Sequence, residues 1–281
     1  MRSNYSFFAV LKTWVVSDCG MDILLYLQHT NHKSSNMKTK LLSYLSFFFI
    51  TVAFSQQMPI VYLDYVTVLN KDVEKHLEAE KNIFSKMHKE QIDMGNKIGW
   101  DMWQISNNGY GEPTTTFMYV HIQPESTISQ SPSKIFTEYE LDGHQAAYAS
   151  RIVKTGNLMM SIKGTYGTNP GEKPYKFVVA NYMAVDIYKQ YEYEQMELKA
   201  GSNYSQNGRA AWGFGKILSR FGSDHEVNYI TYDFYESMDA ILSTRNNTIK
   251  SSKAQMEVWK SYDDLRELKD SNIMTLIASE R

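Results

Sequence analysis

Cysteine is nearly absent from this sequence: its 281 residues include one, Cys19. Cys19 precedes the segment that we interpret below as the start of the protein, so the mature chain is expected to form no disulfide and no cysteine-ligated metal site. An excess of charge of one sign is also missing, since 29 Lys and Arg residues face 31 Asp and Glu residues. The net charge of −2 predicts no basic surface for nucleic acid, and we expect no nucleic-acid partner.

Motifs that mark common catalytic and cofactor sites are missing as well. The sequence has no GxSxG, no HExxH, no phosphate-binding loop and no GxGxxG between a predicted strand and helix. His144 and His225 have no second ligand at metal-binding spacing. We therefore predict no metal and no other cofactor, and we leave open whether the protein is an enzyme.

One apolar run stands out near the N-terminus, from Leu41 to Phe54. It follows Met37 and two lysines and ends at Ala53-Phe54-Ser55, which is the three-part pattern of a secretory signal. The run is shorter than the roughly 20 residues that a membrane-spanning helix needs.

The run therefore predicts three processing features. Met37 is the expected true start, residues 1–36 are an upstream extension from a misplaced start codon, and residues 37–55 are a signal peptide. The mature protein is then secreted or periplasmic, without stable membrane insertion. The alternative is an uncleaved signal anchor.

The rest of the chain contains a near repeat. Asn157–Ser161 (NLMMS) returns as Asn272–Leu276 (NIMTL), and each copy follows a charged run, predicted to be helical, with an Arg and a Lys at equal distances. The similarity extends over nearly the whole mature chain, so we predict two tandem units, residues 57–166 and residues 174–281. The paired basic residues are Arg151 and Lys154 in the first unit and Arg266 and Lys269 in the second.

The first unit is predicted to run strand, helix, strand, strand, helix, strand. Ile60–Leu69 is rich in β-branched and aromatic residues and predicts a strand. Apolar residues three, four and seven apart predict a helix from Val73 to Ile98. The other predicted elements are strands at Trp100–Ser106, Thr115–Gln123 and Leu158–Gly164, and a helix within Glu138–Lys154.

The second unit repeats this order. Trp212–Leu218 takes the place of the first unit's second strand, and Tyr229–Phe234 that of its third. The fold class predicted is α+β, with two tandem ferredoxin-like (βαββαβ) repeats. Its other elements are strands at Lys176–Val185 and Ile273–Ala278 and helices at Ile187–Ala211 and Ser252–Leu268.

Two such units in one chain resemble the dimeric α+β barrel superfamily, whose small domains pair through the open faces of their sheets. The segment Phe84–Ile105 is also similar to secreted tandem-barrel proteins of largely unknown function, in which a His, a Glu, a Gly and a Gly-Trp pair recur. The second unit departs from this pattern, with Ala200 and Ser202 at the His and Glu positions. The matching residues of the first unit are His88, Glu90, Gly95, Gly99 and Trp100.

The resemblance implies an intramolecular barrel around a central cavity, and strand alternation predicts the side chains that line it. We assign the apolar set Met118, Val120 and Ile122 to the helix-covered face, which turns Tyr119 and His121 toward the cavity. His121 and Asp233 form the pair of greatest interest, because an imidazole beside a carboxylate can act as a base or orient a ligand. The alternative is that His121 is a structural strand residue. The predicted ligand-binding residues are Tyr119, His121, Asp233, Tyr229, Asp64 and Asn181.

Two functions stay open. The first is a noncatalytic module that binds a small apolar or aromatic ligand, or a partner, in or around the cavity. The second is a cofactor-free monooxygenase-like or heme-related barrel enzyme, a class that the resemblance includes. The enzyme requires His121 and Asp233 within hydrogen-bond reach, and a heme protein requires an axial histidine, for which His121 is the candidate. The binding module predicts an interior filled by Tyr and Met. The sequence predicts no oligomeric state.

Overall fold

The computed structural model describes residues 59–106, 113–124, 133–167, 175–221, 226–248 and 252–281. The predicted extension (1–36) and signal peptide (37–55) lie outside these residues. Within the described ranges, no helix combines the length and the apolar character that crossing a membrane requires.

Eight antiparallel strands close into a barrel, in the neighbour order β1-β3-β2-β8-β5-β7-β6-β4. We call residues 59–167 the first half and residues 175–281 the second half. The seams between the halves are antiparallel pairs, β2 with β8 and β4 with β6. The strands are β1 (Ile60–Leu69), β2 (Gly99–Ile105), β3 (Thr114–Gln123), β4 (Ile152–Tyr166), β5 (Phe177–Val185), β6 (Ala211–Phe221), β7 (Tyr229–Tyr235) and β8 (Arg266–Glu280).

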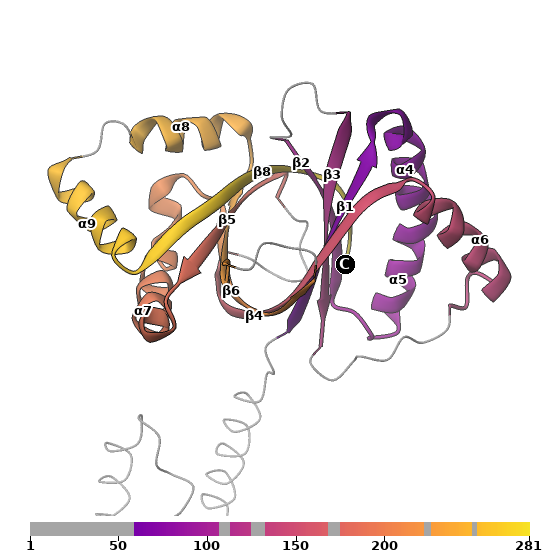
Figure 1. The fold of residues 1–281 in the computed structure, drawn as a ribbon, viewed down its shortest axis with the longest axis horizontal. Helices are drawn as coiled ribbons and strands as arrows, with labels where there is room; N and C mark the ends of the chain where they lie inside the picture. The colour runs from indigo at the N-terminus through magenta and orange to yellow at the C-terminus, as the bar shows by residue number, and fades with distance from the viewer. Residues whose placement is uncertain (1–58, 107–112, 125–132, 168–174, 222–225, 249–251) are drawn as a thin grey trace, which may run out of the picture. The chain divides into compact units, whose positions relative to one another are not determined.

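The helices lie outside the barrel. Figure 1 shows α4, α5 and α6 on one side of it and α7, α8 and α9 on the other. The predicted mixed α+β class is therefore confirmed. The helices of the first half are α4 (Val73–Ala79), the π-helical turn η2 (Glu80–Phe84), α5 (Ser85–Asp93) and α6 (Glu138–Ala149). Those of the second half are α7 (Gln190–Gly201), α8 (Met238–Thr248) and α9 (Lys253–Asp263), and short turns lie at η1 (Asn70–Asp72), η3 (Ile187–Lys189) and η4 (Tyr204–Asn207).

The last helix of each half is shorter than predicted. α6 ends at Ala149 and α9 at Asp263, and Lys154, Arg266 and Lys269 lie on long strands instead of helices. β4 and β8 have 15 residues each, and each forms hydrogen bonds with a neighbour on both sides, one of them across a seam. The charged runs themselves pair with β1 and β5, and these backbone hydrogen bonds outweigh their helical preference.

The interior of the barrel is occupied by one hydrophobic cluster with members from all eight strands. At its centre the hydroxyls of Tyr65 and Tyr182, one from each half, lie 2.8 Å apart. The Tyr and Met side chains that were expected to fill the interior are found there. They include Tyr182, Tyr232, Met118, Met160 and Met274.

The predicted assignment of strand faces is wrong. Met118, Val120 and Ile122 belong to the interior cluster, whereas Phe117 and Tyr119 pack against Val73 and Leu77 of α4. Both faces of β3 are covered, by the packed interior on one side and by helices on the other. Alternation shows that two faces exist, but when both are buried it does not show which one points inward.

Candidate functional site

The six predicted ligand-binding residues lie between the barrel and its helices, in two separate groups. His121 Nε2 lies 3.1 Å from Asp64 Oδ2 in the first half. Asp233 pairs with Arg209 and Asn181 in the second half. His121 and Asp233 therefore do not pair with each other, because each points away from the interior toward the helices of its own half.

In the first half, His121 is part of a buried chain of polar groups. Lys97 Nζ, on a residue only 9% exposed, donates to His121 Nδ1 at 2.9 Å and to His88 Nδ1 at 3.0 Å. Burial lowers the pKa of Lys97 to about 8 and also lowers the pKa of both histidines. The His88 ring packs on Trp100 with centroids 4.6 Å apart. Both ring nitrogens of His121 are engaged within the protein.

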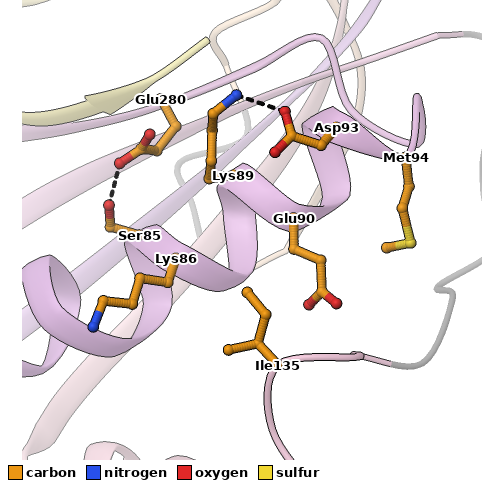
Figure 2. A pocket seen from close by; sticks show the side chains of 8 residues that line it. All are labelled: Ser85, Lys86, Lys89, Glu90, Asp93, Met94, Ile135 and Glu280. Carbon is orange, nitrogen blue, oxygen red and sulfur yellow. Dashed lines mark hydrogen bonds and ion pairs between the residues drawn. The ribbon is translucent and has the colours of Figure 1, made fainter.

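Glu90, the second residue of the His-x-Glu pattern, serves to attach a loop. It accepts hydrogen bonds from Ser133 Oγ at 2.8 Å and from the backbone N–H of Lys134. The loop thereby lies against α5 at the edge of a surface groove of about 410 Å³ (Figure 2). In this groove Lys89 pairs with Asp93 and Ser85 donates to Glu280, so these three charged groups are already bound within the protein. None of the predicted site residues lines it.

The second half contains a pocket of about 370 Å³ on the outer face of the sheet, lined mainly from β5, β6, β7, β8, α7 and α9. Two predicted residues, Asn181 and Asp233, line it. α7 approaches the sheet closely because Gly201 has no side chain: a Cβ there would lie 2.4 Å from the Trp212 ring. The remaining lining residues are Met183, Glu197, Ala200, Asn203, Arg209, Trp212, Thr231, Val258, Tyr262, Arg266 and Leu268.

Two arginines and two carboxylates meet in this pocket. Arg209 Nη1 lies 2.8 Å from Asp233 Oδ1, and Arg266 Nε lies 3.9 Å from Glu197 Oε1. That second separation is too long for a hydrogen bond. Arg266 Nε is buried without a hydrogen-bond partner among the described residues, and the guanidinium lies 5.2 Å from the centre of the Tyr262 ring. The pocket thus offers a cationic donor beside an aromatic wall.

Burial shifts the charge balance of the pocket. It raises the pKa of Glu197, which is 5% exposed, and that of Asp233, although the neighbouring arginines offset part of both shifts. An arginine keeps its charge at every physiological pH. The pocket therefore combines two arginines with two carboxyl groups whose ionisation is opposed by burial, and its arginines suit an anionic group on an otherwise aromatic or apolar ligand.

Tyr119 and Tyr229 are packing residues. Tyr229 is fully buried, stacks on Phe214 with centroids 5.5 Å apart, and donates to Glu194 Oε1 at 2.8 Å. The Tyr119 hydroxyl lies 2.7 Å from His76 Nε2 beneath α4. Neither residue lines the second-half pocket.

Glu80, which is 2% exposed, makes the first half sensitive to pH. Burial raises its pKa to about 7, partly offset by hydrogen bonding from Tyr119 and Tyr148 and by the charge of Arg151. A carboxyl group whose pKa is raised in the folded state stabilises the protein least when it is ionised. The contribution of Glu80 to stability is therefore lost as the pH rises from about 4.5 to 7.

We expect Glu80→Gln to remove this loss. Between pH 4.5 and pH 8 the free energy of unfolding of the wild type should fall by about 3 kcal/mol relative to that of the variant. Urea unfolding of both proteins at the two pH values measures the difference. An equal effect of the substitution at both pH values would contradict it.

Of the four charged residues that line the pocket, the sequence predicted Asp233 as a site residue and missed Glu197, Arg209 and Arg266, although a signal for Glu197 was present. Glu80 and Glu197 each stand 15 residues after the paired Tyr65 and Tyr182. Arg266 was recognised as the counterpart of Arg151, but both were expected on helices. Arg209 gave no signal, because it follows η4 in a segment whose path depends on the fold around it.

Comparisons with known proteins bear on the fold. No family model and no curated protein matches the sequence. Among solved structures, the chain is similar to a provisionally named monooxygenase from Fusobacterium nucleatum, at 13% identity and a TM-score of 0.55, over 80% of this chain and 94% of that one. It is similar to another from Lactobacillus acidophilus, at 9% identity and a TM-score of 0.54, over 80% and 96% of the two chains.

A third similar structure is an anthrone oxidase-like protein, at 13% identity and a TM-score of 0.50, over 80% of this chain and 94% of that one. Identities this low establish likeness of fold alone. This chain therefore shares with these proteins the α+β barrel fold that the sequence resemblance implied.

Proposed function

We propose that this protein is an α+β barrel module that binds a small organic acid with an aromatic or apolar body. The binding site is the second-half pocket between the barrel and α7 and α9. The observation that carries the proposal is Arg266, which lines a pocket of about 370 Å³ and whose buried Nε has no hydrogen-bond partner among the described residues. A buried donor of this kind is costly unless a ligand or water accepts from it.

The walls of the pocket favour the rest of such a ligand. Trp212 and Tyr262 offer ring faces, and Met183, Val258 and Leu268 add apolar surface. A ligand whose carboxylate accepts a hydrogen bond from Arg266 would place its aromatic body against these walls. This ligand retains the aromatic or apolar character expected from the sequence and adds an acidic group.

Benzoate and its neutral counterpart benzamide test the proposal. We expect benzoate to bind more tightly than benzamide in isothermal titration calorimetry, and Arg266→Gln to weaken benzoate binding about 10- to 100-fold, the usual worth of a charge-assisted hydrogen bond. Arg220→Gln removes the same charge from β6 outside the pocket and should leave binding unchanged. Equal affinities for the two probes, or an unchanged affinity in Arg266→Gln, would contradict the proposal.

The alternative is a cofactor-free oxygenase, and two of the similar structures are provisionally named monooxygenases. The pair on which this prediction rested, His121 and Asp233, lies in separate halves with separate partners. An oxygenase would instead use Glu197, whose raised pKa suits a general base in the same pocket. Oxygen uptake with a phenolic substrate, lost in Glu197→Gln, would favour the oxygenase.

A heme function does not fit the residues of this site. The proposed axial ligand, His121, is bound to Lys97 and Asp64 in the other half. The described residues that line the pocket include no histidine. We therefore propose no heme function for this pocket.

We also propose that the two halves are tandem ferredoxin-like repeats. In support, each half has the strand order of that unit, β4-β1-β3-β2 and β8-β5-β7-β6. Glu80 with Arg151 and Glu197 with Arg266 hold equivalent places in the two halves. An experimental structure whose halves failed to superpose strand for strand would count against the duplication.

A further inference from the structure

The first half contains a buried cluster of polar residues at the places that correspond to the second-half pocket. Glu80 lies in η2, His76 one turn earlier in α4, and Arg151 immediately before β4. His76 Nδ1 and Arg151 Nε are both buried without a hydrogen-bond partner among the described residues. His76 itself is fully buried. The cluster therefore contains two donor or acceptor atoms that no described group satisfies.

Two residues of this cluster match residues of the second-half pocket. Glu80 corresponds to Glu197, and Arg151, just before β4, corresponds to Arg266, the first residue of β8. In both halves a buried carboxyl group from the first helix faces an arginine whose Nε has no partner in the described part of the chain. The combination on which the proposed acid site depends, a buried carboxyl group beside an arginine with an unpaired Nε, is thus present in both halves.

The two halves differ in the side chain that covers the cluster. In the first half the Tyr148 ring of α6 stacks on His76 with centroids 4.8 Å apart and contacts Phe84 edge-on at 5.0 Å. In the second half Tyr262 of α9 lies over Arg266, beside the open pocket. Tyr148 therefore packs directly on this cluster in the first half, whereas the second half has an open pocket beside Arg266.

The helix that carries Tyr148 is weakly held. None of the residues of α6 is buried, and most of its side chains are exposed to solvent. Tyr148 contacts His76 and Phe84 through its ring and hydrogen-bonds to Glu80 through its hydroxyl, so a ligand that displaces the tyrosine must replace these contacts.

We propose that the space occupied by Tyr148 is a second binding site for a small organic acid, which enters by displacing the tyrosine and pairs with Arg151. The inference rests on the proposed function, since it assigns the same class of ligand to the corresponding place in the first half. It adds that the site is closed by a side chain of the protein itself.

Benzoate titration of Tyr148→Ala tests the inference. We expect two equivalents of benzoate to bind to this variant and one equivalent to bind tightly to the wild type. Adding Arg151→Gln should remove the new equivalent and keep the original one, and adding Arg266→Gln should do the reverse. Thermal unfolding verifies that each variant is folded, and Tyr148→Leu, which keeps an apolar contact with Phe84, replaces Tyr148→Ala if the latter does not fold.

One equivalent of benzoate in the folded Tyr148 variants would overturn the inference, as would a second equivalent that survives Arg151→Gln. Failure of the proposed function gives a different result. In that case the wild type binds no benzoate, whereas Tyr148→Ala still binds one equivalent that depends on Arg151.

Discussion

Replacing Trp103 with alanine is expected to lower the free energy of unfolding by about 3–5 kcal/mol, the usual cost of removing a large aromatic side chain from a packed core. Trp103 is 2% exposed and belongs to the cluster that occupies the barrel interior. Its ring lies 6.5 Å from that of Phe234, which comes from the other half. The side chain therefore helps to hold the two halves together.

Urea unfolding measures this loss. The matched control is Tyr139→Ala on α6, where the tyrosine is 89% exposed and the expected change is within about 0.5 kcal/mol. A loss below about 1 kcal/mol for Trp103→Ala would mean that the interior tolerates an empty space. The original prediction of a ligand cavity at the centre of the barrel would then regain support.

Arg266→Met should have the second large effect, a loss of about 3–5 kcal/mol at pH 8, because it leaves a buried carboxylate without its cation. That carboxylate is Glu197, which is 5% exposed. Loss of the arginine raises the pKa of Glu197 further, so the destabilisation grows as the pH rises and shrinks as the pH falls and Glu197 takes up a proton.

A double-mutant cycle separates this effect from lost packing. Glu197→Gln with Arg266→Met should recover most of the stability, because no buried charge is then left unpaired. Additive losses in the double variant, or a loss independent of pH, would show that Arg266 acts through its contact with Tyr262 and not through Glu197. Both proteins with Arg266→Met also lack the guanidinium group that is proposed to bind the ligand. Stability and benzoate binding can therefore be compared within one set of proteins.

The sequence predicted the parts of the fold that depend on short-range patterns. β1 has the predicted bounds, and β2, β3 and β7 agree to within one residue at each end. The correspondence of Arg151 with Arg266 was also visible, because equal spacing from a repeated segment needs no structure to detect. α8 was missed, since it is anchored chiefly through Ile241 against Val179 and Tyr235, and one such residue gives no periodic signal.

The sequence by itself determined the order of the strands and the correspondence of the paired basic residues, since strand alternation and the spacing within a repeat can be read along the chain. Only the tertiary structure decided which face of each strand points inward, because a barrel covered by helices buries both faces. It also decided which half has an open pocket. Tyr148 and Tyr262 occupy similar places in sequence, and the packing around each one determines whether its ring fills the site or forms its wall.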